Sequence, residues 1–318
     1  MIAQPKRSSE LTASAAETPL LNQIKEIIRT QGIIPLTSYM QLCLTHPQHG
    51  FYRQPTPFGK AGHFTTAPEI CQIFGEIVGI WLASKWMELG QPEAINLVEL
   101  GPGRGTLMSD LLRGTKHIKG LHDAITIHYV DINETQRSPQ KDAAIPHINV
   151  QKIHWQERME DMCTQLSDTP TFMIGNEFLD CLPLHQAVWK DGQWYSRCVG
   201  LDHADNLVFT YGPPCAGPKL LPQKMMPLKK TLPIYEHLPD LERVLTLLGT
   251  ALKKRGGGYA ADGLWIYCPS LQGYFSSDLA PSTHFTTGKT WRCRSHGACG
   301  FSSCSRQDLP FRTVLYFR

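Results

Sequence analysis

The chain has 318 residues, of which 42% are hydrophobic and 19% are charged. This composition is typical of one large or two ordinary globular domains and excludes a disordered or fibrous chain. Lys and Arg number 31 against 28 Asp and Glu, a net charge of +3, so charge gives no reason to expect a nucleic-acid partner. The apolar run at residues 77–83 is far shorter than the roughly 20 residues that cross a bilayer, and we expect no membrane insertion.

The N-terminal segment has no apolar core of the kind that a secretory signal needs, and Glu10 and Glu17 are unlike an Arg-rich transit helix. We therefore expect residues 1–18 to be a flexible lead of a cytoplasmic protein. The chain has ten cysteines, which we expect to be reduced thiols in that compartment. Four of them follow residue 260, where acidic residues become sparse.

Apolar spacing predicts helices over residues 20–31 and 36–45, and Gly32 and Pro35 separate them. Residues 55–69 contain too many Gly and Pro for regular structure. The helical pattern returns over residues 69–89, where one side is predicted to be buried. That side comprises Ile73, Ile77, Ile80, Trp81 and Trp86.

Short apolar strands follow at residues 94–100, 125–131, 147–155 and 171–175, and a helix is expected over residues 106–113. Strands that alternate with helices in this way predict an α/β fold with a doubly wound parallel sheet. Residues 186–212 contain Asp191-Gly192 between aromatic runs, which predicts a β-hairpin inserted after the fourth strand.

The first of these strands ends in a glycine-rich turn, Glu99-Leu-Gly-Pro-Gly-Arg-Gly-Thr106. The spacing of Gly101, Gly103 and Gly105 is not the G-x-G-x-x-G of dinucleotide folds, and no Gly-Lys-Ser/Thr follows to hold a triphosphate. Asp131 ends the next strand, where a carboxylate can accept both ribose hydroxyls of an adenosine. Together these features favour S-adenosylmethionine, although an ordinary glycine turn with a helix-capping Asp remains an alternative.

Two further carboxylates, Glu177 and Asp180, follow the fourth strand, in Asn176-Glu-Phe-Leu-Asp-Cys-Leu-Pro183. They are expected at the same edge of the sheet as the glycine turn. One interpretation is that they cap the next helix. The other is that they bind a cationic acceptor, because carboxylates pair with an arginine guanidinium in bidentate geometry and help it to lose a proton.

Three long blocks, at residues 58–76, 98–108 and 176–186, resemble the MidA family of methyltransferases, and the similarity runs from about Pro19 to Ala260. The resemblance implies a class I S-adenosylmethionine-dependent fold with an N-terminal helical cap. It also implies dimethylation of an arginine in a respiratory complex I subunit, which in eukaryotes takes place in the mitochondrial matrix. This sequence has His63, Cys71 and Asp131 where the family usually has Asp, Ser and Glu.

On this basis we expect a helical cap with a substrate loop at residues 19–92 and a cofactor-binding α/β domain with the inserted hairpin at residues 93–260. The family's later blocks, a strand ending Asp-Tyr-Gly and a Pro-Gly-Glu-Ala-Asp-Leu-Thr-Ala-His-Val-Asp-Phe segment, are not visible. Codons can be chosen for residues 262–301 so that a one-base shift restores similar blocks in order. The sequence therefore predicts that residues 261–318 are read out of frame, and that the sheet lacks its fifth and later strands.

The alternative for this C-terminal part is a zinc site at Cys293, His296, Cys299 and Cys304. The cysteines are spaced without the C-x-x-C knuckle of structural zinc sites, and we expect no metal.

Two functions follow. The first is methyl transfer to a protein arginine, with Glu177 and Asp180 as catalytic residues. The alternative is a complex I assembly or binding factor without catalysis on the same fold, or an inactive truncated product. Cofactor binding separates them, because only the enzyme needs S-adenosylmethionine. Its predicted cofactor-binding residues are Glu99, Gly101, Gly103, Gly105 and Asp131.

Overall fold

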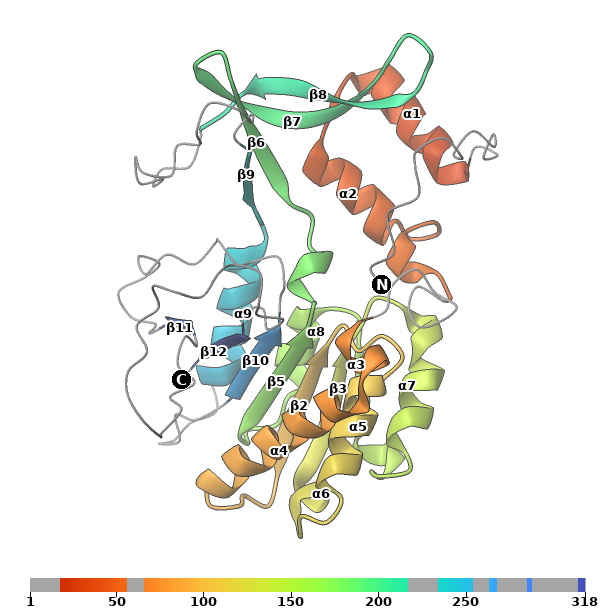
Figure 1. Ribbon diagram of the computed structural model, residues 1–318. Helices are drawn as coiled ribbons and strands as arrows, with labels where there is room; N and C mark the ends of the chain where they lie inside the picture. Colours follow the sequence, from red (N-terminus) through yellow and green to blue (C-terminus); the bar gives the residue numbers. More distant parts are fainter. Residues whose placement is uncertain are drawn as a thin grey trace, which may run out of the picture. The chain divides into compact units, whose positions relative to one another are not determined.

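The computed structural model describes residues 18–55, 66–216, 234–253, 263–267, 285–287 and 314–317 (Figure 1). The chain divides into two compact units. The antiparallel unit comprises Met1–Cys43 and His185–Glu236, and the seven-stranded unit comprises Leu44–Leu184 and His237–Arg318. The predicted flexible lead, the proposed zinc ligands and most of the predicted out-of-frame segment lie outside the described residues.

The antiparallel unit is a small sheet accompanied by two helices, α1 (Pro19–Gln31) and α2 (Leu36–Thr45). The predicted hairpin is present, and its turn residues Asp191 and Gly192 both have positive φ, as a tight two-residue turn requires. The strands are β1 (Ile34–Pro35), β6 (His185–Lys190), β7 (Gln193–Leu201), β8 (Leu207–Pro214) and β9 (Ile234–His237). Nζ of Lys25 in α1 lies 3.1 Å from Oδ2 of Asp205, which belongs to the loop between strands β7 and β8.

The seven-stranded unit contains one sheet in the order β11-β12-β10-β5-β2-β3-β4. The pairs among β10, β5, β2, β3 and β4 are parallel, whereas β12 runs antiparallel to both of its neighbours. The strands are β2 (Ile95–Leu100), β3 (Ile125–Val130), β4 (Ile153–Gln156), β5 (Thr171–Asn176), β10 (Gly263–Tyr267), β11 (Phe285–Thr287) and β12 (Val314–Phe317).

Two predictions about this sheet need correction. The strand expected over residues 147–155 begins only at Ile153, because a 3-10 turn, η3 (Val150–Lys152), precedes it. The sheet was also expected to end at β5, but β10 pairs with β5 in parallel, from Gly263↔Phe172 to Tyr267↔Asn176. A Leu-Trp-Ile-Tyr run favours a strand whatever its origin, so β10 does not test whether the segment is read out of frame.

Helices cover both faces of this sheet (Figure 1). One core includes residues of α4 (Gln72–Glu88) and α5 (Thr106–Thr115), packed on β2 and β3. The other includes residues of α8 (Met159–Gln165) and α9 (Leu241–Lys253), packed on the opposite sides of β2 and β5. The remaining helices are α3 (Ala67–Ile70), α6 (Leu121–Ala124), α7 (Arg137–Ala144) and the 3-10 turns η1 (Phe51–Arg53), η2 (Glu134–Gln136) and η4 (Leu179–Cys181).

The predicted buried side of α4 is largely wrong. Ile73, Ile77 and Ile80 are 59%, 60% and 60% exposed, whereas Trp86 is buried. The reason is that α4 lies on α5 through its glycines: a Cβ on Gly79 would stand 2.6 Å from the carbonyl oxygen of Leu111. That close approach selects the glycine side of the helix and leaves the isoleucines facing outward.

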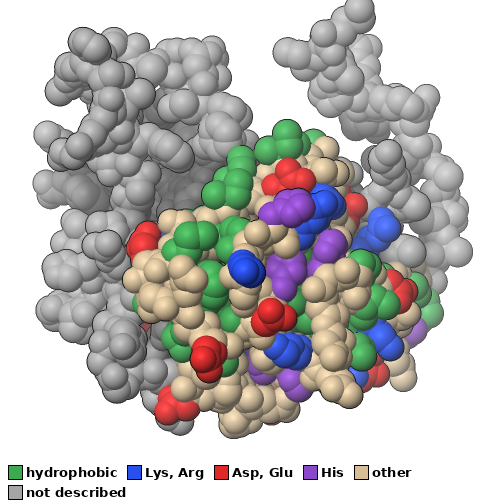
Figure 2. All heavy atoms as spheres, turned by 90° about the horizontal axis from the view of Figure 1, so that it is seen from below, with side chains coloured by type: hydrophobic (Ala, Val, Ile, Leu, Met, Phe, Trp, Pro, Cys, Tyr) green, Lys and Arg blue, Asp and Glu red, His purple; other side chains and the backbone are tan. Residues whose placement is uncertain are grey.

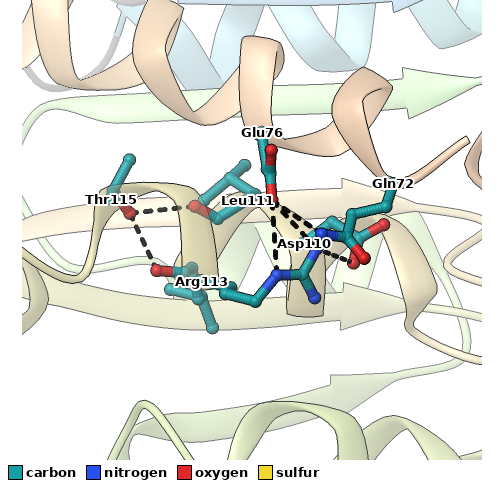
Figure 3. Close-up of polar contacts among 7 residues, drawn as sticks. Gln72, Glu76, Asp110, Leu111, Arg113 and Thr115 are labelled. Atoms are coloured by element: carbon teal, nitrogen blue, oxygen red, sulfur yellow. Dashed lines mark hydrogen bonds and ion pairs between the residues drawn. The ribbon is translucent and has the colours of Figure 1, made fainter.

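Polar contacts join the same two helices (Figure 3). The guanidinium of Arg113 on α5 bonds Asp110 at 2.6 Å and Glu76 of α4 at 3.3 Å. Gln72 donates to Glu76 at 3.1 Å. These contacts orient α4 along α5, the helix that begins at the glycine-rich turn.

Figure 2 shows histidine side chains close together, among side chains of both charges, on the face seen from below. The rings of His122 in α6 and His147 have centroids 6.5 Å apart. Burial lowers the pKa of both imidazoles.

Among the described residues, no helix is both long enough and apolar enough to cross a membrane.

The two units group the elements differently from the predicted ranges. The helices α1 and most of α2 belong with the inserted strands, whereas residues 44–92 belong with the seven-stranded sheet. This grouping arises because β1 pairs with β7, with Ile34 opposite Val199. The N-terminal helices thus share a unit with the hairpin, more than 140 residues further along the chain.

Candidate functional site

The sheet reverses its strand order between β2 and β5. The chain passes from β2 to β3 and β4 on one side, and then returns to β5 and β10 on the other. In open α/β sheets, ligands bind outside the carboxyl ends of the strands at such a switch point. The predicted site residues all follow β2, β3 or β5 at this edge, except Glu99, which lies within β2 near its end.

The glycine-rich turn follows β2 and leads into α5. Gly101, Gly103 and Gly105 have φ of 64°, 55° and 81°, values that favour glycine. A Cβ on Gly105 would stand 3.0 Å from Cα of Gln140 on α7, and one on Gly101 would stand 3.3 Å from the ring of Phe178. The turn therefore packs closely against α7 and against the segment after β5, and a side chain at Gly101 or Gly105 would meet them.

Two contacts fix the start of α5. The hydroxyl of Thr106 donates to Glu69 of α3 at 2.7 Å, and Arg104 lies 3.9 Å from the same carboxylate. The amide of Gly101 donates to the carbonyl of Val130 at 2.9 Å. The turn is held from both sides.

Asp131 follows β3 next to this turn. Its Oδ1 accepts from the amide of Asn133 at 2.9 Å, and its Oδ2 accepts from the side chain of Gln140 at 2.8 Å. Burial raises the pKa of Asp131 to about 6, opposed by these two hydrogen bonds and by Arg137 and Arg53. At neutral pH the group is a partly buried carboxylate with acceptor capacity left for a ligand.

Glu99 is 3% exposed, and among the described residues its Oε2 has no hydrogen-bond partner. Burial, and then the charge of Asp131, raise its pKa to about 8. A buried carboxyl oxygen without a partner is costly in a protein. Glu99 lies in β2 just before the glycine turn, so its Oε2 could accept a hydrogen bond from a cationic or other donating group of a ligand.

Glu177 and Asp180 follow β5. Glu177 has φ of 56°, which is unusual for a residue other than glycine. Asp180 lies in η4 and is exposed. The short contact between Gly101 and Phe178 places this segment beside the glycine turn. The structure thus brings the predicted cofactor and acceptor residues to one edge.

Tyr52 belongs to the same cluster, although no sequence pattern assigned it a role. Its hydroxyl is hydrogen-bonded to the thiol of Cys181, and the charges of Asp180 and Glu177 act on it. Burial raises the pKa of Tyr52, and it raises that of Cys181 to about 11. A phenol with a raised pKa remains a neutral donor beside the two carboxylates.

The loop that carries Tyr52 is bound to the end of β3. The side chain of Asn133 donates to the carbonyls of Tyr52 and Gln54, both at 2.8 Å. Arg53 donates to the carbonyl of Ile132 at 2.9 Å and to Glu157 at 2.6 Å. The sequence signal, an aromatic pair in a Gly- and Pro-rich stretch, does not reveal these contacts because they join residues 79 to 104 positions apart.

The residues fit S-adenosylmethionine on three counts. The turn has glycine at three positions of positive φ, Asp131 supplies a carboxylate directly after β3, and among the described residues Glu99 has a buried oxygen without a hydrogen-bond partner. Among the described residues no group of three or more His, Cys, Asp or Glu is arranged to hold a metal. Strand order, antiparallel β12 and glycine turn together define the class I methyltransferase fold.

Comparison with known proteins identifies the family. A family model described as "Putative S-adenosyl-L-methionine-dependent methyltransferase" matches residues 77–266, more than half of the chain. The chain therefore belongs to this family of S-adenosyl-L-methionine-dependent methyltransferases, and the resemblance to MidA proteins is confirmed.

Curated relatives include "Protein arginine methyltransferase NDUFAF7 homolog, mitochondrial" of Drosophila melanogaster, 33% identical over 284 residues, which cover 80% of this chain and 61% of that protein. The human protein arginine methyltransferase NDUFAF7 is 31% identical over 273 residues, covering 77% of this chain and 60% of that protein. The chain thus spans about six tenths of the length of these two relatives.

A solved structure supports the fold. It is a COG1565 superfamily protein from Burkholderia thailandensis bound to S-adenosyl-homocysteine, with a TM-score of 0.63 and 20% identity. The similarity covers 78% of this chain and 61% of that chain. At this identity the comparison concerns the fold, and it agrees with the predicted class I architecture.

Proposed function

We propose that this chain transfers a methyl group from S-adenosylmethionine to an arginine side chain of a protein. The observation that carries the proposal is the convergence of two pairs of carboxyl groups at one edge of the sheet. Glu99 and Asp131 lie by the glycine turn, and Glu177 and Asp180 lie after β5. The curated relatives named as protein arginine methyltransferases support the choice of acceptor.

Asp131 would accept hydrogen bonds from the ribose hydroxyls, and Glu99 would bind the amino group of the methionine part. Gly101, Gly103 and Gly105 let the backbone approach that part closely. When bound, S-adenosylmethionine supplies a methyl group on a sulfonium, a good leaving group. The protein contributes mainly by bringing donor and acceptor together in line.

Glu177 and Asp180 act on the acceptor. An arginine guanidinium is protonated at neutral pH, so a proton must leave its nitrogen as the new bond forms. Two carboxylates orient the planar group by paired hydrogen bonds and receive that proton. Tyr52 remains neutral. It is hydrogen-bonded to Cys181 and lies near enough to Glu177 and Asp180 for their charges to act on it.

We propose that the partner is a protein substrate, because the curated relatives are named as protein arginine methyltransferases. A respiratory complex I subunit is the first candidate. We propose the mitochondrial matrix as its location if the organism is eukaryotic, and the cytoplasm otherwise. The naming of the curated relatives as mitochondrial supports the first part.

The test is Asp180→Asn, which keeps the shape of the side chain and removes its charge. Purified protein and methyl-labelled S-adenosylmethionine are added to a protein extract of cells that lack this gene, and methylarginines are measured after hydrolysis. We expect transfer at least about tenfold slower than in the parent, with cofactor affinity nearly unchanged.

The matched control is Asp168→Asn, an exposed aspartate at the amino end of β5. It should transfer methyl groups like the parent. Equal transfer by Asp180→Asn and the parent would remove Asp180 from the acceptor site. Absence of methylarginine with the parent, despite cofactor binding, would favour the assembly factor without catalysis.

A further inference from the structure

The amide of Gln140 joins three parts of the cofactor edge. Gln140 lies on α7 and is fully buried. Its Nε2 donates to the carbonyl of Gly103 at 2.9 Å and to Oδ2 of Asp131 at 2.8 Å. Its Oε1 accepts from the indole of Trp155 at 3.0 Å. One side chain therefore connects the glycine turn, the end of β3 and strand β4.

Trp155 determines which way this amide points. An indole N–H can only donate, so the oxygen of Gln140 must face it. Both amide hydrogens are then directed at Gly103 and Asp131. Trp155 is itself packed against Tyr129 of β3, with ring centroids 6.1 Å apart. The orientation of Gln140 is thus fixed by the packing of the sheet.

The bond to Gln140 stabilises the charged form of Asp131. Burial raises the pKa of this carboxyl, whereas the hydrogen bonds from Asn133 and Gln140 lower it. The other groups that face it come from four elements. Arg53 of η1 and Arg137 of α7 lower the pKa of Asp131 and so favour its charge. The charge of Asp131 in turn contributes to the raised pKa of Glu99 of β2 and of Cys181 of η4.

We propose that Gln140 is a positioning residue for the cofactor: oriented by Trp155, it holds the carboxylate of Asp131 toward the ribose hydroxyls and couples it to the glycine turn. This rests on the proposed function, in which Asp131 binds the ribose. Because the amide of Gln140 is bonded to both Asp131 and the glycine turn, the residues that bind the ribose and the methionine part are held in a preformed geometry. This preorganisation lowers the free-energy cost of binding the cofactor.

The test is calorimetry with S-adenosylhomocysteine at several pH values from about 5.5 to about 8.5, a range that covers the raised pKa values of Asp131, about 6, and Glu99, about 8. Gln140→Leu should weaken binding about tenfold at neutral pH, the effect of one hydrogen bond to a charged group. It should also move the pH at which affinity is lost upward. Trp155→Phe should give a smaller change in the same direction, because the amide is then free to turn.

Gln156→Leu is the matched control. Gln156 is the next residue of β4, is buried, and bonds Gln165 of α8 at 2.9 Å on the other face of the sheet. It should bind the ligand like the parent. An equal loss in Gln156→Leu would attribute the effect to general packing and overturn the proposal.

Asp131→Asn separates this proposal from the proposed function. If Asp131→Asn binds like the parent at every pH, the ribose assignment fails. If it weakens binding while Gln140→Leu and Trp155→Phe keep the parent's affinity and pH midpoint, only the role of Gln140 is overturned. Thermal unfolding establishes that each variant is folded. If Gln140→Leu does not fold, the affinity and pH midpoint of Trp155→Phe decide whether the role of Gln140 holds.

Discussion

At the scale of single residues, the glycine turn can be tested without disturbing the fold. Gly103 has φ of 55°, so Gly103→Ala should cost about 1–2 kcal/mol of stability and add a methyl group to the turn that we propose to carry the methionine part. We expect a loss of S-adenosylhomocysteine affinity of at least about tenfold, measured by calorimetry.

Gly192→Ala is the matched control, because it imposes a similar backbone strain at a turn far from the glycine-rich turn in the sequence. Gly192 has φ of 84° in the hairpin turn, and a Cβ added there would meet nothing within 4 Å. The substitution should lower stability by a similar amount and leave affinity unchanged. Similar affinity in both variants would mean that the turn does not contact the cofactor.

The buried carboxyl of Glu99 predicts a pH-dependent stability. Its pKa is about 8 in the folded protein against an ordinary value of 4.5, so between these values the folded state keeps a proton that the unfolded chain releases. The free energy of unfolding therefore falls as pH rises through this range. Glu99→Gln should be more stable than the parent, by a margin that grows from about pH 5 to about pH 8.

Thermal unfolding of both proteins across this range measures the margin. A constant difference in melting temperature would show that Glu99 is ionised throughout. Asp131→Asn serves as a comparison, since the pKa of Asp131 is raised only to about 6 and its margin should level off at lower pH.

Residue patterns revealed only part of this site. Gly101, Gly103, Gly105, Asp131, Glu177 and Asp180 were selected because each follows a strand, and parallel strands end at one edge. Gln140 and Tyr52 could not be selected in this way. Their importance arises from hydrogen bonds to residues distant in sequence, such as those from Asn133 to the loop of Tyr52.

At the scale of secondary-structure elements, the α4–α5 contact depends on glycine. A Cβ on Gly79 would meet backbone, the carbonyl oxygen of Leu111 at 2.6 Å. Gly79→Ala should therefore destabilise the protein by about 1–3 kcal/mol through overpacking, measured by urea unfolding. Because α5 begins at the cofactor turn, affinity for S-adenosylhomocysteine should fall as well.

Gly249→Ala in α9 is the control, since a Cβ there meets nothing within 4 Å. It should stabilise the helix by up to about 1 kcal/mol. Equal destabilisation by both variants would indicate that close packing is not what distinguishes Gly79. A neutral Gly79→Ala would contradict the close packing of α4 on α5.

The isoleucine stripe of α4 shows why helical periodicity was insufficient. This helix is apolar on more than one side, so the spacing of Ile73, Ile77 and Ile80 was compatible with burial or exposure. The deciding feature was Gly75 and Gly79, four residues apart, which allow another helix to approach. The boundaries next to Gly32 and the glycine turn were predicted well, because these residues interrupt the pattern clearly. The start of β4 was not, because the turn at Val150–Lys152 has no such signal.

At the scale of the whole molecule, the strand order could be anticipated from the βα alternation, but the pairing of distant segments could not. No local signal joins β1 to β7, or β12 to β10. The prediction that residues 261–318 are read out of frame is tested by the coding DNA over codons 256–305. A shifted frame without stop codons that encodes Asp-Tyr-Gly after β5 and α9 is expected, and stop codons in that frame would contradict it.

We propose that the carboxyl ends of β2, β3 and β5 form one site that binds S-adenosylmethionine and presents its methyl group to an arginine. A crystal structure of this chain with S-adenosylhomocysteine tests it most directly. We expect the ribose hydroxyls on Asp131, the methionine part over Gly101–Gly105, and the sulfur directed toward Glu177 and Asp180. A ligand bound elsewhere, or with its sulfur facing away from Glu177 and Asp180, would contradict it.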